Sequence, residues 1–243
     1  MTRPGTIPVS GPDQRSGVAG ARPTLVDLSH TVEHGMTTYP GLPGPIICDY
    51  LSREASRGRY APGVEFQIGK IEMVANTGTY LDSPFHRYAD GKDLAQLTFD
   101  RLADLPAIVV RAPWESGRPL GPEAFEGLPA GGAAVLIHTG WDAHWRTARY
   151  GIANPYLTAA AAELLVREGA ALVGIGSVNI DDLEDPARPV HSTLLGAEVP
   201  IVEHLTGLRS VPGRGARFFA VPAKVAGFGT WPVRAFAAVK GEG

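Results

Sequence analysis

Four side chains with different acid–base chemistry lie close together in one stretch of the sequence. An amide, a phenol, a carboxylate and an imidazole follow one another at short intervals, as Asn76, Tyr80, Asp82 and His86. Such groups can move protons, orient a carbonyl group or bind a divalent cation. The apolar run 66–74 before them predicts a core strand that delivers the polar residues on a tight turn. The same residue types are ordinary turn formers, so a polar surface loop stays open as an alternative.

Hydrophobic periodicity predicts a domain in which strands outnumber helices. The clearest helix spans residues 158–168, with Thr158 as its cap. It lies between two aliphatic runs, which predicts a right-handed strand–helix–strand unit over residues 133–176. The fold class is therefore α/β, a mixed β-sheet with helices packed on its outer face. The predicted strands are 24–29, 65–74, 107–111, 133–138, 170–175, 199–203, 217–223 and 233–239.

The composition is that of a soluble globular protein with no affinity for polyanions. Of 243 residues, 44% are hydrophobic and 19% charged, and the net charge of −3 argues against nucleic-acid or anionic-membrane partners. No apolar run approaches the roughly 20 residues that span a bilayer. The single cysteine, Cys48, excludes internal disulfides, predicts a cytoplasmic location and lies in an apolar run that predicts burial.

The chain has the length of one α/β domain. Residues 1–22 are rich in proline and glycine and lack the apolar region of a signal peptide, so we expect a disordered leader. Residues 23–243 show no internal repeat and no long linker, and we expect them to form a single domain.

Several short motifs resemble, in order, the cyclase family that includes bacterial kynurenine formamidase and isatin hydrolase. The family signature reads His-x-Gly-Thr-His-x-Asp-x-Pro-x-His. This sequence matches it at Gly78, Thr79, Asp82, Pro84 and His86, and departs from it at Asn76 and Tyr80, which replace two metal-binding histidines. The other similar segments are 27–30 with 39–41, 138–141, 174–181, His191 with Glu203, and 222–234. The resemblance implies a swivelling β/β/α-type domain that assembles as a homodimer or homotetramer.

The resemblance also implies a chemistry. Asp82, His191 and Glu203 fall at metal-ligand positions and would bind a divalent ion, Zn²⁺ or Mn²⁺, while His86 would carry the proton. The implied enzyme is a hydrolase acting on carbon–nitrogen bonds other than peptide bonds, with a small cyclic or aryl amide, lactam or lactone as its substrate. An amide and a neutral phenol are poor ligands, so the loss of two histidines should weaken metal binding by orders of magnitude.

A metal-free interpretation gives the same residues other roles. The catalytic set would be Tyr80 as a hydroxyl donor, Asp82 and Glu203 as a carboxyl pair with separated pKa values, and His86 as the relay. Asn76 would orient a carbonyl group, and Tyr39 and Phe85 would line an aromatic pocket. Three functions therefore stay open: a metal-assisted hydrolase, a metal-independent lyase, isomerase or cyclase acting on a carbonyl metabolite, and a non-catalytic small-molecule binder on a decayed enzyme scaffold.

Overall fold

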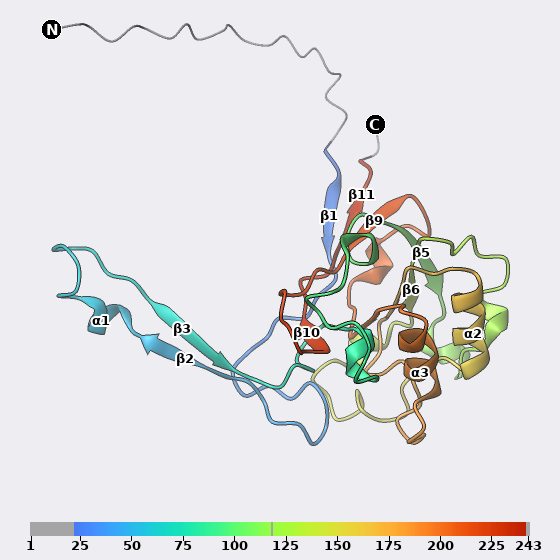
Figure 1. Cartoon of the computed structure of the whole chain (residues 1–243), viewed down its shortest axis with the longest axis horizontal. Coiled ribbons are helices and arrows are strands. Elements are labelled where there is room, and N and C mark those ends of the chain that lie inside the picture. Colours follow the sequence, from blue (N-terminus) through green and yellow to red (C-terminus); the bar gives the residue numbers. More distant parts are fainter. Residues whose placement is uncertain (1–21, 118, 242–243) are drawn as a thin grey trace, which may run out of the picture.

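The structure is a computed structural model that describes residues 22–117 and 119–241, so the predicted leader, except its last residue, lies outside the described residues. A curled nine-stranded sheet forms the body, and a narrow arm projects from it (Figure 1). The strands of the sheet are β1 (Thr24–Asp27), β4 (Tyr80–Asp82), β5 (Leu105–Arg111), β6 (Ala134–His138), β7 (Leu172–Ile175), β8 (Ile201–Glu203), β9 (Ala216–Phe219), β10 (Thr230–Pro232) and β11 (Phe236–Val239). The arm carries β2 (Ile46–Leu51), α1 (Arg53–Ser56) and β3 (Ile68–Glu72), and the body adds α2 (Ala159–Arg167) and α3 (Pro189–Gly196).

The sheet is mixed, as the sequence predicts. Its strand order is β1-β11-β9-β5-β6-β7-β8-β4-β10. The central strands β5, β6, β7 and β8 run parallel, and the flanking pairs are antiparallel. This confirms the α/β class and gives β4, the strand that carries Tyr80 and Asp82, neighbours from the last fifth of the chain.

The unit β6–α2–β7 confirms the predicted strand–helix–strand crossover. Helix α2 begins after Thr158, whose hydroxyl accepts a hydrogen bond from the Ala161 amide at 3.2 Å. Ala161 and Leu165 are buried and pack in one apolar cluster with Val135 and Val173 of the sheet. Helix α3 packs beside α2 on the same face, while the opposite face of the sheet encloses a second apolar cluster around Leu136 and Phe218.

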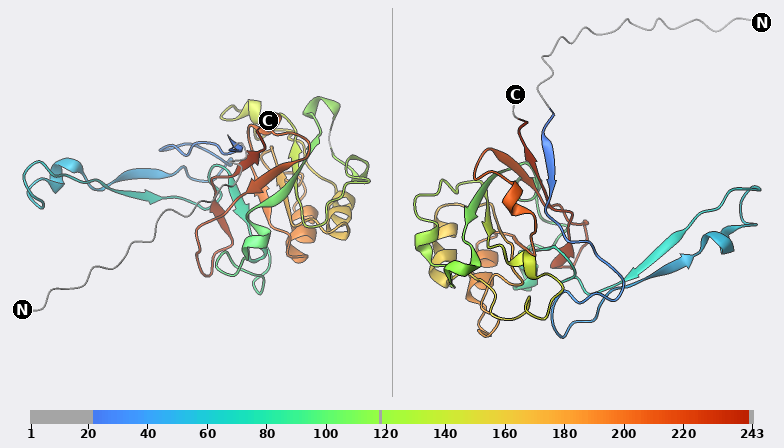
Figure 2. Two further views of the ribbon diagram at one scale, coloured as in Figure 1. Left: turned by 90° about the horizontal axis from the view of Figure 1, so that it is seen from above. Right: turned by 180° about the vertical axis from the view of Figure 1, so that it is seen from behind.

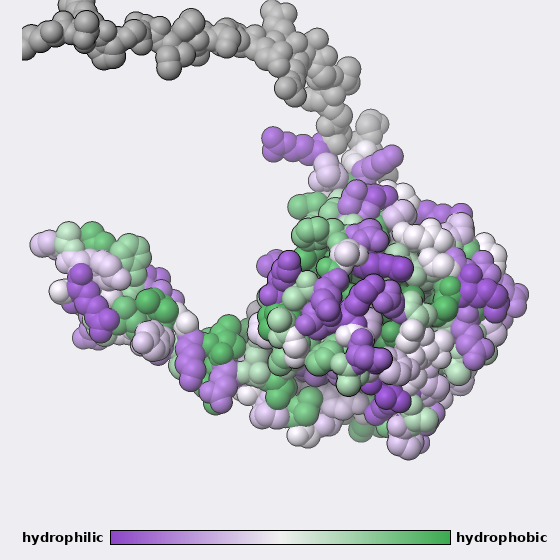
Figure 3. All heavy atoms as spheres, in the orientation of Figure 1, coloured by the Kyte–Doolittle hydropathy of each residue, from purple (hydrophilic) through white to green (hydrophobic). Residues whose placement is uncertain are grey.

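The expectation that residues 65–74 form a core strand is wrong. Strands β2 and β3 pair only with each other and extend away from the body in every view (Figure 2). All five residues of β3 are exposed, and hydrophobic side chains remain visible on the arm (Figure 3). Cys48, on β2, is exposed rather than buried. Apolar alternation predicts a pleated strand, but it does not specify what covers that strand.

None of the helices formed by the described residues is both long enough and apolar enough to cross a membrane. This agrees with the absence of long apolar runs in the sequence.

A half-buried histidine, His30, gives the fold a predictable pH dependence. The His30 ring stacks on Trp145 with 3.9 Å between ring centroids. Burial lowers the pKa of His30 from 6.5 to about 4. The unfolded chain therefore binds this proton first as the pH falls, and the stability that neutral His30 contributes above pH 6.5 is lost towards pH 4.

We expect His30→Phe to flatten this dependence while keeping the stacking. Between pH 7 and pH 5, the wild-type free energy of unfolding should fall by about 1–2 kcal/mol more than that of the variant. Urea denaturation at the two pH values measures the difference, and the exposed His34→Phe is the control. Equal losses in wild type and His30→Phe would contradict the prediction.

Candidate active site

Strand β4 places the polar side chains of the motif against β8. Tyr80 lies directly opposite Glu203 in the antiparallel pairing, so residues 80–82 form a strand and not the predicted tight turn. The turn comes just before, at Gly78, whose φ of +68° favours glycine and where a Cβ atom would lie 3.0 Å from the Val32 side chain. Because side chains alternate along a strand, Tyr80 and Asp82 face the same side.

Tyr80 and Glu203 form a buried hydrogen-bonded pair. The Tyr80 hydroxyl donates to Glu203 Oε2 at 2.7 Å, and the Ile180 amide donates to Oε1 at 2.7 Å. Burial raises the pKa of Glu203 to about 7, and the nearby Asp82 charge acts in the same direction. Burial also raises the pKa of Tyr80 well above 10, so Tyr80 is a neutral donor and not a phenolate ligand. In this arrangement its hydrogen is committed to Glu203, and the predicted donation to substrate stays a prediction.

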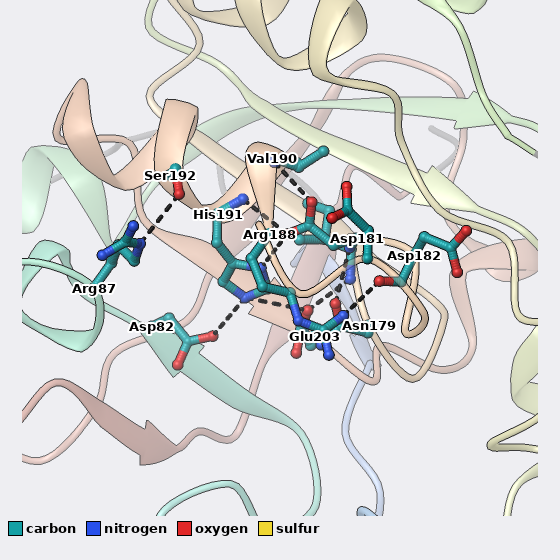
Figure 4. Close-up of polar contacts among 12 residues, drawn as sticks. Asp82, Arg87, Asn179, Asp181, Asp182, Arg188, Val190, His191, Ser192 and Glu203 are labelled. Atoms are coloured by element: carbon teal, nitrogen blue, oxygen red, sulfur yellow. Dashed lines mark hydrogen bonds and ion pairs between the residues drawn. The ribbon is translucent and has the colours of Figure 1, made fainter.

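His191, on α3, stands at the centre of the cluster (Figure 4). Its Nδ1 lies 2.6 Å from Asp181 Oδ2, while its Nε2 lies 3.8 Å from Asp82 Oδ2 and 3.6 Å from Glu203 Oε1. Burial lowers the pKa of His191, but the bond to Asp181 and the carboxylates around the ring outweigh it and raise this pKa to about 10. Asp181 is itself fixed by the amides of Val190 and His191. The ring is therefore held with Nε2 towards Asp82 and Glu203.

Thr230, on β10, joins Asp82 to His86. Its hydroxyl donates to Asp82 Oδ1 and lies 2.8 Å from His86 Nδ1. A hydroxyl has one hydrogen, so His86 Nδ1 must be the donor in the second bond. Burial raises the pKa of Asp82, but His86 and His191 lower it more, so the carboxylate stays ionised. Asp82 Oδ2 is buried and has no hydrogen-bond partner among the described residues.

The donor set fits one divalent cation. Ligand atoms of Asp82, His86 and His191 all lie within 4.8 Å of one another. The unpartnered Asp82 Oδ2 and a histidine whose other nitrogen is held by a carboxylate are typical of such sites. One carboxylate and two imidazoles suit Zn²⁺ or Mn²⁺, which would compete with the proton on His191. Both oxygens of Glu203 already accept hydrogen bonds, so its predicted role as the third ligand stays a prediction.

A cavity of about 440 Å³ opens onto this cluster. Six of the residues that line it were singled out from the sequence. The others include two arginines and the loop residues 40–42. Its lining is Tyr39, Pro40, Gly41, Leu42, Asn76, Tyr80, His86, Arg87, Asn179, Arg188, His191 and Glu203. Asp82 lies behind them, fully buried, and Phe85 is on the same turn as His86 but not in this lining. The assignment of Phe85 to substrate binding therefore stays a prediction.

Comparison with known proteins places the chain in a known group. Residues 26–182 match the model of the Cyclase family. The chain belongs to the cyclase family. This cyclase-family chain is 26% identical to kynurenine formamidase from Bacillus anthracis over 216 residues, which cover 86% of this chain and 95% of that protein. It is 27% identical to kynurenine formamidase from Bacillus mycoides, with the same coverage.

Solved structures agree on the architecture of this cyclase-family chain. Isatin hydrolase A from Labrenzia aggregata, bound to benzyl benzoate, matches with a TM-score of 0.76 and 23% identity, covering 90% of this chain and 94% of that one. A potential metal-dependent hydrolase with cyclase activity matches with a TM-score of 0.72 and 22% identity, covering 90% and 99%. At these identities the structural matches support the fold alone.

The candidate site includes three residues that the sequence did not single out for chemistry. Asp181 lies at the end of the segment 174–181 that is similar to the family, and it orients His191. Thr230 and Arg188 carry no local signal. Thr230 reaches Asp82 across 148 residues of sequence, and only the pairing of β10 with β4 brings it there.

Proposed function

We propose that the protein is a hydrolase that cleaves the carbon–nitrogen bond of a small aryl amide or cyclic lactam by attack of water on the carbonyl carbon. The observation that carries this proposal is the convergence of four side chains that can bind an ion or move a proton. Asp82, His86, His191 and Glu203 come from three distant segments; the last three line one cavity, and Asp82 lies directly behind them. The curated relatives are kynurenine formamidases, and one structural match is an isatin hydrolase, which agrees with this bond type.

The residues of the chain have separate tasks in this reaction. Asp82, His86 and His191 would hold a divalent ion, which when bound polarises a carbonyl group and lowers the pKa of water. Glu203 faces the cavity from its buried position and is placed to accept a proton from the attacking water. Tyr80 holds Glu203 in place. As the carbon–oxygen bond forms and the carbon–nitrogen bond breaks, that proton passes to the leaving nitrogen.

The test is hydrolysis by the purified protein. N-formylkynurenine, isatin and simple lactones are assayed after chelation and after addition of Mn²⁺ or Zn²⁺. We expect turnover of at least one amide or lactam, with activity restored by one of the two ions. No turnover under any condition would contradict the hydrolase function and favour the non-catalytic binder.

A metal-independent acid–base enzyme is the second candidate. The observation that favours it is the buried pair of a neutral Tyr80 hydroxyl and a Glu203 carboxyl whose pKa burial raises to about 7. Such a pair can serve proton transfer next to a carbonyl group, as in an isomerase or lyase. Elemental analysis separates the candidates, because one ion per chain in protein purified without chelators contradicts the metal-free version.

Assembly as a homodimer or homotetramer, and a cytoplasmic location, remain predictions. Apolar side chains on the arm, such as Ile71 and Phe66, are more than half exposed and would suit contact with a second copy. Size-exclusion chromatography with light scattering measures the oligomeric state.

A further inference from the structure

Two arginines line the candidate site, and their hydrogen bonds go to neutral oxygens. Arg87 Nε donates to the Ser192 hydroxyl at 3.1 Å. Arg188 donates to the main-chain carbonyls of Asp182 at 2.6 Å and Leu183 at 3.3 Å. Among residues 22–117 and 119–241, neither guanidinium forms an ion pair with a carboxylate, although both line the cavity that contains His191. The wall of this cavity therefore carries two guanidinium groups that have no carboxylate partner within ion-pair distance among the described residues.

Arg188 is held in a fixed position. It precedes α3 with φ 48° and ψ 57°, a left-handed backbone that is unfavourable for a residue with a side chain. The two bonds to carbonyls behind it fix the guanidinium plane, and Figure 4 shows the side chain beside Asn179 and His191. A strained residue whose charged head is locked in a cavity wall is typical of a functional position.

Arg188 retains donors for a ligand. A guanidinium has five N–H groups, of which two serve the carbonyls of Asp182 and Leu183. A further interaction joins Arg188 to the Tyr39 hydroxyl at the cavity wall. At least two N–H groups are left, which is the number that a bidentate carboxylate requires.

We propose that the substrate is an anion, an aryl amide or lactam that carries a carboxylate, and that Arg188 binds this carboxylate while Arg87 adds positive charge at the rim. This inference rests on the proposed function, because the scissile carbonyl would lie at the Asp82–His191 end. A cavity of about 440 Å³ admits a compound with one aromatic ring and two small substituents. The acidic side chains at that end, Asp82 and Glu203, are fully buried and lie next to His191. The His191 ring therefore partly offsets their repulsion of the substrate carboxylate.

Direct binding tests the carboxylate site without any turnover. The probes are benzoate and neutral benzamide, titrated calorimetrically into the wild type, Arg188→Gly, Arg188→Lys and Arg146→Gly. Glycine accepts the left-handed backbone, so Arg188→Gly removes the guanidinium without new strain. Arg146 is the matched control, since it has φ 63° but pairs with Glu33 outside this cavity. We expect Arg188→Gly to weaken benzoate binding about 10- to 100-fold, because a charge-assisted bidentate pair is lost. Arg188→Lys should lie between, and benzamide binding should not change.

Kinetics with a matched pair of substrates tests the same site in the reaction. N-formylanthranilate carries the carboxylate, and its methyl ester does not. In Arg188→Gly we expect KM for the acid to rise at least about tenfold, with KM for the ester unchanged.

The inference is overturned if Arg188→Gly binds benzoate as the wild type does. It is also overturned if KM rises equally for the acid and the ester in this variant. If neither compound is hydrolysed by the wild type but benzoate binding depends on Arg188, the hydrolase function fails and the anion site stands.

Discussion

Asp82→Asn is expected to lower kcat/KM for an aryl formamide at least about 10³-fold. The side chain is fully buried, its Oδ2 has no hydrogen-bond partner, and it lies 3.8 Å from His191 Nε2. An asparagine keeps the shape but removes the charge that a cation or the His191 imidazolium requires. Steady-state kinetics and metal titration measure the two consequences.

The control for Asp82→Asn is Asp90→Asn, an exposed aspartate eight residues on. It should leave both kcat/KM and metal affinity unchanged. Circular dichroism checks whether Asp82→Asn is folded. A folded Asp82→Asn protein with activity within tenfold of the wild type would contradict the central role of this carboxylate.

Glu203→Gln and His86→Gln are both expected to lower activity, the first with the metal ion retained and the second with the metal ion lost. Glu203→Gln keeps the acceptor oxygen but loses the proton acceptor, so kcat should fall about 10²- to 10⁴-fold while one ion per chain is retained. His86→Gln removes an imidazole from the set that lies within 4.8 Å, so metal affinity should fall about 100-fold or more, and activity with it. Metal titration and single-turnover rates of both variants measure the difference.

The opposite pattern would reverse the two roles. Loss of the ion in Glu203→Gln, with retention in His86→Gln, would make Glu203 the third ligand and His86 the proton carrier, as the family resemblance implies. Glu203 Oε1 lies 3.6 Å from His191 Nε2, close enough for both to bind one ion, so the two variants must be compared.

The frame of the site was predictable because it is local. The motif fixes the turn at Gly78 and the two-residue spacing of Tyr80 and Asp82, and strand alternation then sets their common direction. Thr79 has a structural reason to follow this glycine. Its hydroxyl donates to the His204 carbonyl at 2.7 Å and accepts from the His30 amide at 3.0 Å, so it ties the motif to two other segments.

What the sequence did not predict depends on contacts between distant segments. The run 65–74 has the apolar alternation of a buried strand, yet β3 lies on an exposed arm because its only partner is β2. Nothing in the sequence distinguishes Thr230 from other threonines, and only the pairing of β10 with β4 brings it to Asp82. A functional role for Arg188 is indicated only by its backbone conformation before α3 and by its place in the cavity wall.

The position of β4 between β8 and β10 has a consequence for biosynthesis. Asp82 depends on a hydroxyl that the ribosome adds 148 residues later. A nascent chain that already contains the motif, α3 and β8 still lacks Thr230, so its carboxylate and His86 have no common anchor. Catalysis should therefore begin only after residue 230 has been added, and truncation before residue 230 should abolish turnover without deleting Asp82, His86, His191 or Glu203.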